Sequence, residues 1–180
     1  VIRLKNGGNA AMKIVVLNGS PRVNGNTAAM TKAFAEGAAE AGHEVEIVPV
    51  AKLKIAGCLG CEYCHTKGCG KCVQKDDMQT LYPLLEEAEM IVFASPIYYH
   101  GFSAQLQCAI HRFYAPGRFP NMKKAALFLT SGEDGVYDGA EFEYNGCFIK
   151  YWGLQDMGIF KILEDCDDFT KFNEFGRSLV

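Results

Sequence analysis

The sequence has little net charge and no long hydrophobic run. Its 180 residues carry a formal net charge of −3, and no apolar run approaches the ~20 residues that are needed to span a bilayer. Without a basic stripe, the chain has no electrostatic footprint for nucleic acid or anionic lipid. We therefore expect no nucleic-acid partner and no membrane span, and small-molecule or protein partners instead.

The sequence also lacks a charged leader followed by an apolar run and a small-residue cleavage site. A secreted disulfide framework is therefore not indicated, and we expect the 8 cysteines to be reduced in a cytoplasmic protein. Internal repeats, low-complexity tracts and linkers are absent as well. We expect a single domain over residues 12–180, preceded by a polar extension at 1–11 that lies outside the fold.

What the sequence does contain is an alternation of apolar strands with amphipathic helices. Continuous apolar runs at 14–17, 90–94 and 125–129 are typical of strands that are covered on both faces. Two further strands, at 44–49 and 158–163, carry polar residues and are expected at the sheet edges, the first with one wet face. Helices are expected over 27–41, 77–88, 102–114, 140–151 and 169–179.

This alternation predicts parallel strands joined by right-handed crossovers. The expected fold is a three-layer α/β sandwich with a five-stranded parallel sheet in the flavodoxin-like order 2-1-3-4-5. Ligands in such sheets bind beyond the carboxyl ends of the strands, where the strand order reverses. That rule indicates three loops as the candidate site, at 18–27, 95–101 and 130–135.

The first loop, 18–27 (NGSPRVNGNT), runs into a helix N-terminus and contains the donors that a phosphate requires. Backbone N–H groups and the helix dipole attract an anion there. The side chains of Ser20, Asn26 and Thr27 add donors, and Arg22 adds a charge-assisted bond. No lysine follows the second glycine, so a monophosphate fits better than a triphosphate. The alternative is a glycine-rich turn with an ordinary helix cap.

The second and third loops suit the rest of a nucleotide-like ligand by their position. Tyr98 and Tyr99 in the second loop stand where a flat heterocycle would extend from the phosphate. The alternative is that both rings only cover the end of the sheet. The third loop is rich in hydroxyl groups and glycine, and its position rather than its composition makes it a candidate.

Three separated motifs, in this order, resemble one known family. They are MKIVVLNGSPR at 12–22 with GNT at 25–27, CVQKDDM at 72–78, and SPIYY at 95–99. Over about residues 12–178 the chain resembles the flavodoxin-like NADPH-dependent FMN reductases, and its cysteines make it similar to the iron-sulfur flavoproteins among them.

The resemblance implies a set of FMN contacts. The FMN phosphate would be held by Ser20, Arg22, Asn24, Asn26 and Thr27. The isoalloxazine ring would contact Pro96, Ile97, Tyr98 and Tyr99, with Ser131 and Gly132 closing the far side. The chain departs from the family pattern at Gln107, at His111-Arg112 and at His100, where relatives often show Lys, Asp-Arg and Gly. These departures concern nicotinamide nucleotide preference and a helix ion pair rather than FMN binding.

Five of the cysteines fall in one loop, over 56–75, with the spacing C-x2-C-x2-C-x4-C-x2-C. The first three match the run that surrounds a [4Fe-4S] cluster, and the spacing leaves Cys69 or Cys72 as the fourth ligand. The resemblance favours the second choice, so the predicted ligands are Cys58, Cys61, Cys64 and Cys72. The alternatives are a zinc site between two cysteine pairs and a loop of free thiols.

The resemblance implies an FMN-dependent NAD(P)H oxidoreductase that passes electrons from the reduced nicotinamide nucleotide to a flavin, a quinone or another small-molecule acceptor. The flavin itself carries the chemistry, so no side chain is assigned a catalytic role. The alternative is an iron-sulfur flavoprotein that carries electrons between a ferredoxin-like partner and FMN. A thiol-based redox or metal sensor is a third hypothesis. The family also suggests a homodimer or homotetramer.

Overall fold

The structure is a computed structural model that describes residues 2–4, 12–164 and 166–180. A single six-stranded sheet runs through the described residues in the order β1-β3-β2-β4-β5-β6. The strands are β1 (Ile2–Leu4), β2 (Lys13–Asn18), β3 (Glu44–Pro49), β4 (Met90–Pro96), β5 (Lys124–Ser131) and β6 (Gln155–Leu163).

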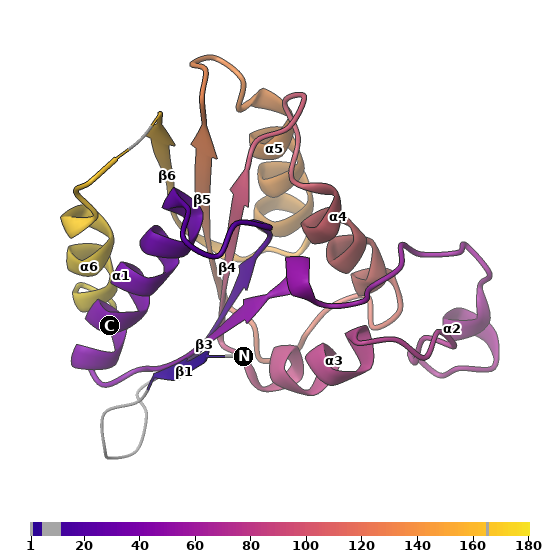
Figure 1. Ribbon diagram of the computed structural model, residues 1–180. Coiled ribbons are helices and arrows are strands. Elements are labelled where there is room, and N and C mark those ends of the chain that lie inside the picture. The colour runs from indigo at the N-terminus through magenta and orange to yellow at the C-terminus, as the bar shows by residue number, and fades with distance from the viewer. Residues whose placement is uncertain (1, 5–11, 165) are drawn as a thin grey trace.

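Helices cover both faces of this sheet. They are α1 (Asn26–Glu40), α2 (Tyr63–Thr66), α3 (Met78–Glu87), α4 (Ala104–His111), α5 (Asp138–Glu143) and α6 (Thr170–Arg177). Figure 1 shows α1 and α6 on one face and α3, α4 and α5 on the other, which confirms the predicted three-layer α/β sandwich. None of the helices in the described part of the chain is long and apolar enough to cross a membrane.

The alternation of side chains along the strands builds one apolar core on each face. Ile14 and Val16 of β2 pack toward α1 and α6, whereas Val15 and Leu17 pack toward α3 and α4. Both sets are buried because β2 lies in the middle of the sheet, between β3 and β4. The continuous apolar runs of the sequence therefore correspond to strands that are covered on both faces, as expected.

The prediction of five parallel strands is wrong in strand number and direction. Five strands are parallel and keep the predicted relative order, as β3-β2-β4-β5-β6. The sixth, β1, pairs antiparallel with β3, with Ile2 opposite Ile47. It comes from the segment 1–11, which was expected outside the fold. The three residues of β1 are too few to show a strand pattern in the sequence. The other residues of the segment 1–11 lie outside the described ones.

The added strand also changes the environment of β3. The sequence predicts one wet face for this strand because glutamates alternate with apolar residues. In the structure Glu46 is only 7% exposed and forms an ion pair with Arg3 of β1. Arg3 of the neighbouring strand thus covers the Glu46 carboxylate, which the alternating sequence pattern of β3 predicts to be exposed to solvent.

Two predicted helices continue in other helical forms. The helix expected over 102–114 consists of α4 and a 3₁₀ turn, Arg112–Tyr114, and the one expected over 140–151 begins as α5 and continues as a π-helical segment, Tyr144–Tyr151. On the other side of the sheet from α1, the chain between β3 and α3 makes a long excursion that contains a 3₁₀ turn, Val50–Lys52, and α2. This excursion extends away from the sheet beyond α3 and α4 (Figure 1).

Candidate functional site

The loop that follows β2 is folded against its own backbone. The Oδ1 atom of Asn18 accepts a hydrogen bond from the Ser20 N–H (2.9 Å), and Ser20 Oγ accepts one from the Arg22 N–H (3.2 Å). At Gly19 the backbone passes so close to the start of α4 that a Cβ atom would lie 2.6 Å from Ser103 Oγ. The turn therefore requires glycine at position 19, and it leads the chain into α1.

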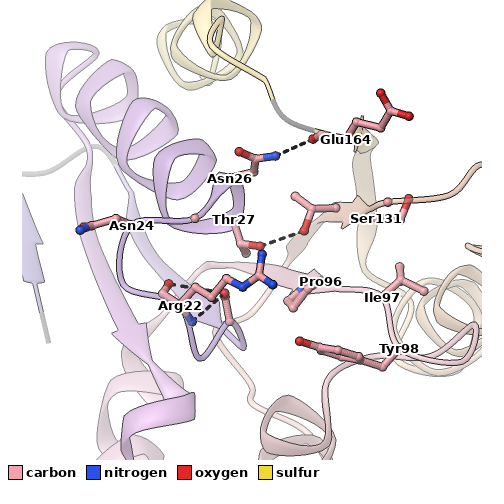
Figure 2. A pocket seen from close by; sticks show the side chains of 13 residues that line it. Arg22, Asn24, Asn26, Thr27, Pro96, Ile97, Tyr98, Ser131 and Glu164 are labelled. Carbon is pink, nitrogen blue, oxygen red and sulfur yellow. Dashed lines mark hydrogen bonds between the residues drawn. The ribbon is translucent and has the colours of Figure 1, made fainter.

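The start of α1 presents open donors. Gly25 occupies the N-cap position, so no side chain caps the helix, and the first turn contains no acidic residue. The N–H groups of a first helical turn have no partner within the helix, and the helix dipole adds partial positive charge. Figure 2 shows the Arg22 guanidinium extended toward Thr27, whereas the Asn24 amide is turned away from both. An anion at this end of α1 would meet backbone donors and a cation.

Two side-chain contacts join the start of α1 to the strands beside it. The hydroxyl groups of Thr27 and Thr130 are 3.0 Å apart, and Asn26 Nδ2 donates to the carbonyl oxygen of Glu164 (2.6 Å) (Figure 2). Two hydroxyl groups that share one hydrogen bond keep one hydroxyl hydrogen for a further acceptor. The contacts therefore hold the walls of the site together and still leave a donor.

The loop after β4 is a tight turn. Tyr98 and Gly101 exchange two backbone hydrogen bonds of 3.0 Å, and the two residues between them, Tyr99 and His100, both have positive φ, 49° and 66°. The N–H of Ala140 in α5 donates to the His100 carbonyl (3.0 Å) and holds the turn in place. Left-handed backbone is unfavourable for residues with a Cβ, so neighbouring structure must maintain this conformation.

The three loops enclose one cleft of about 580 Å³ at the carboxyl ends of β2, β4 and β5. This volume lies in the range of small-molecule and cofactor sites, ~300–1,000 Å³. The residues that line the cleft are Ser20, Arg22, Asn24, Gly25, Asn26, Thr27, Pro96, Ile97, Tyr98, Thr130, Ser131, Gly132 and Glu164.

Ten of the eleven residues that the sequence suggested for FMN thus meet in the cleft, although their contact with FMN stays a prediction. Tyr99 does not line the cleft, because its side chain is fully exposed at the tip of the turn. Three lining residues were not among the candidates. Gly25 and Thr130 belong to loops that the strand order indicated, whereas Glu164 follows β6 and carries no motif. Only the position of β6 beside β5 brings Glu164 to the cleft.

The cysteine-rich excursion forms a second, smaller cavity. Its lining includes Cys58, Cys61, Cys64 and Cys72, which are the four predicted ligands, together with Arg112. Cys69 does not line this cavity, and its backbone adopts a positive φ of 46°.

The cysteines of the cavity differ in environment. Cys64 is buried, and this burial raises the pKa of its thiol. Cys58 and Cys61 are exposed, and the Gly60 N–H donates to Cys58 Sγ (3.4 Å). Within the described residues no three Cys, His, Asp or Glu side chains converge closely enough to hold a metal ion. Thiolates are ligands of both zinc sites and four-iron clusters, so the metal that these four cysteines would hold stays a prediction.

A buried ion pair connects the cysteine excursion to the core. Arg112 Nη1 donates to Asp76 Oδ2 (2.6 Å) and to the Ala56 carbonyl (3.0 Å), and Asp76 Oδ2 also accepts from the Ala56 N–H (3.0 Å). Burial is the largest single influence and opposes ionisation of both groups, but their mutual hydrogen bond, the other hydrogen bonds to Asp76 and the charge interactions together outweigh it, so the pKa of Asp76 is lowered and the pKa of Arg112 is raised. Both side chains are therefore charged at neutral pH.

Comparisons with known proteins agree with this architecture. A family model described as NADPH-dependent FMN reductase matches residues 12–145. An iron-sulfur flavoprotein of Archaeoglobus fulgidus is 35% identical over 152 residues, which are 82% of this chain and 66% of that protein. An iron-sulfur flavoprotein of Methanocaldococcus jannaschii is 36% identical over 101 residues, 56% of this chain and 51% of that protein. The chain thus spans between half and two thirds of the length of these curated relatives.

The solved structures show the same fold. An NAD(P)H:quinone oxidoreductase from Methanothermobacter marburgensis superposes with a TM-score of 0.72 over 93% of this chain and 96% of that one, at 17% sequence identity. At this identity the likeness concerns the fold alone, which is α/β and flavodoxin-like.

Proposed function

This chain belongs to the NADPH-dependent FMN reductase family, and we propose that it is an FMN-dependent oxidoreductase. Its reaction would transfer a hydride from NADPH or NADH to FMN and deliver the two electrons to a flavin, a quinone or another small acceptor. The observation that carries the proposal is the cleft, in which an anion-binding helix start and an aromatic loop line one space of about 580 Å³.

The donors of the cleft fit a flavin mononucleotide. The open start of α1, the Arg22 guanidinium and the Ser20 hydroxyl would hold the terminal phosphate. Asn24, Asn26 and Thr27 would complete that half of the site. The isoalloxazine ring would lie against Pro96, Ile97 and Tyr98, with Ser131 and Gly132 on its far side.

The residues that line the cleft indicate which roles belong to the chain and which to the cofactor. When bound, FMN supplies the hydride and electron chemistry. The ionisable side chains that line the cleft are those of Arg22, Tyr98 and Glu164, so the lining contains neither a pair of carboxylates nor a Cys–His pair. The residues of the chain would therefore bind and orient the flavin and exclude water from one side of it.

A second candidate function rests on the cysteine cavity. Cys58, Cys61, Cys64 and Cys72 all line one cavity, and this shared lining supports a [4Fe-4S] cluster held by these four thiolates. With such a cluster the chain would carry single electrons between a ferredoxin-like protein and FMN. The names of the two archaeal relatives agree with this proposal.

Anaerobic reduction separates the two functions. The chain is loaded with FMN and mixed in a stopped-flow instrument with NADPH or NADH, and in parallel with a reduced ferredoxin. Rapid loss of flavin absorbance with a nicotinamide nucleotide supports the oxidoreductase. Rapid loss with reduced ferredoxin alone supports the carrier, and a chain that binds no FMN contradicts both.

Assembly and location stay predictions. A homodimer or homotetramer is expected from the family resemblance, and native mass spectrometry of the FMN-loaded chain would measure it. A cytoplasmic location would be tested by fractionation of the source cells.

A further inference from the structure

Arg112 is the largest of the fully buried side chains, and its guanidinium is only partly paired. The side chain is 0% exposed. Its Nη1 atom is used twice, by Asp76 and by the Ala56 carbonyl. Its Nε and Nη2 atoms, in contrast, are buried without a hydrogen-bond partner among the described residues. One edge of the guanidinium is therefore satisfied and the remaining donors are not.

Such a situation is costly for a charged group. A buried donor without a partner loses its hydration and gains nothing in return, and the penalty is larger when the group is ionised. Buried arginines are normally paired on several nitrogens, because the guanidinium presents five donors in a fixed fork. The open donors of Arg112 therefore indicate an acceptor that belongs to the functional state of the site.

The location of Arg112 identifies the kind of acceptor. The side chain lines the same cavity as the four cysteines. Two other polar side chains of that cavity form hydrogen bonds with neighbours: Glu62 Oε1 accepts one from the Tyr114 hydroxyl (2.9 Å), and Gln74 Nε2 donates one to the Gly57 carbonyl (3.1 Å). The sulfur atoms of the four cysteines are acceptors that line the same cavity as this buried cation.

We propose that the Nε and Nη2 atoms of Arg112 donate hydrogen bonds to the sulfur atoms of a cluster held by Cys58, Cys61, Cys64 and Cys72. This inference rests on the cluster in the second proposed function. Asp76 positions the guanidinium, and Arg112 acts on the cluster without ligating it.

The expected consequence is a higher reduction potential. Each electron that enters a cluster adds a negative charge, and hydrogen bonds to the sulfur atoms together with a fixed positive charge stabilise the reduced form. Removal of Arg112 should therefore make the cluster harder to reduce. If Arg112 only fastens the excursion to the core, its removal changes stability and leaves the potential unaltered.

The test compares the full chain with two variants, Arg112→Gln and Arg112→Lys, after anaerobic reconstitution with iron and sulfide. The cluster potential is measured by titration with dithionite and EPR. We expect Arg112→Gln to shift the one-electron reduction equilibrium at least tenfold toward the oxidised form, which corresponds to ~59 mV. Arg112→Lys, which keeps the charge, should show a smaller shift in the same direction. The matched control is the exposed Arg118→Gln, which should leave the potential unchanged.

A second measurement does not depend on a variant that folds. The chain is labelled with ¹⁵N-arginine, reduced, and examined by pulsed EPR. A ¹⁵N coupling to the reduced cluster supports the proposal, and its absence overturns it. Identical potentials in correctly folded Arg112→Gln and the parent chain overturn it as well.

The two proposals fail in distinguishable ways. If the parent chain binds FMN but takes up no iron and sulfide, the cluster and the role of Arg112 are both wrong, and the oxidoreductase proposal stands. If the cluster assembles but carries no ¹⁵N-arginine coupling, only the role of Arg112 is wrong.

Discussion

The cleft proposed for FMN and the cysteine cavity are built in different ways. The cleft lies where three parallel strands end, and backbone hydrogen bonds of the sheet and of its loops hold it. The cysteine cavity lies in the excursion between β3 and α3, where the regular structure from residue 53 to residue 77 is the single short helix α2. The carboxyl ends of the sheet strands position the cleft, whereas one buried ion pair and a few loop contacts position the cysteine cavity.

This difference has a physical consequence for the two cofactors. A cleft that is fixed by the sheet requires little ordering when FMN binds, so its affinity depends mainly on contacts. A loop with few buried apolar contacts gains order from its metal, and the binding free energy of the metal contributes to folding. We therefore expect changes in the excursion to affect its metal and stability, and changes in the cleft to affect FMN alone.

The largest expected effect separates two neighbouring cysteines. Cys72→Ser removes a thiolate of the cavity and should abolish retention of a four-iron cluster, whereas Cys69→Ser should retain it, because Cys69 lies outside the cavity. Iron and sulfide per chain, measured after anaerobic reconstitution, decide between them. Equal loss in both variants would mean that the cavity does not define the ligand set.

The next effect concerns the ion pair that holds the excursion. Asp76→Asn leaves the buried Arg112 without a counter-charge and should lower the free energy of unfolding by ~3–5 kcal/mol. Glu40→Gln, which breaks the exposed pair with Arg177, is the matched control and should lower the free energy of unfolding far less, because exposed ion pairs contribute little. Urea denaturation at pH 7 measures both. Similar values for the two variants would show that the pair does not anchor the excursion.

The same pair gives the excursion a pH dependence. The pKa of Asp76 is lowered from 3.8 in the folded protein, so the unfolded chain binds the proton more readily. The contribution of the pair is therefore complete above the unfolded pKa and is lost as the pH falls below 3.8 and through the lowered pKa. The difference in stability between the parent chain and Asp76→Asn should narrow over that range. A difference that stays constant from pH 7 to pH 3 would contradict the assignment.

A change in the cleft should affect the cofactor without affecting the excursion. Arg22→Gln would remove the proposed charge-assisted bond to the FMN phosphate, which would be worth ~1.5–3 kcal/mol and would correspond to a roughly tenfold to hundredfold weaker Kd. Riboflavin, which has no phosphate, should bind the parent and the variant equally. Fluorescence titration of the flavin-free chain measures both ligands. An equal loss for riboflavin would show that Arg22 does not contact the phosphate.

The smallest effect concerns the fit of the loop after β2 against α4. In Gly19→Ala the new Cβ would lie 2.6 Å from Ser103 Oγ and 2.7 Å from Leu106 Cβ. The loop must shift, at a cost of ~1–3 kcal/mol in unfolding free energy and with weaker FMN binding. Gly146→Ala is the control, because its Cβ would meet nothing within 4 Å. Equal melting temperatures of the two variants would refute the close approach.

The sequence predicts the cleft better than the excursion, and the reason is local. An apolar run such as that of β4 directly indicates a strand that is buried on both faces. The strand order then brings separate loops together at the carboxyl ends of the strands. The side chain of Tyr99 shows the limit of this reasoning. Its motif agrees with a flavin contact, but the turn geometry around His100 directs it into solvent.

Features that depend on distant segments could not be predicted. The pairing of β1 with β3, the burial of Glu46 beside Arg3 and the approach of Glu164 to Asn26 all join residues that are far apart along the chain. The spacing of the cysteines alone left the fourth ligand open. In the structure Cys72 lines the cavity and Cys69 does not, and the identity of the fourth ligand stays a prediction.

The most direct test of two cofactor regions in one chain is a quantitative analysis of the anaerobically isolated protein. FMN, iron and acid-labile sulfide are measured per chain together with the visible spectrum. The account predicts about one FMN, four irons and four sulfides. A colourless protein that takes up neither FMN nor iron and sulfide when they are supplied would contradict it.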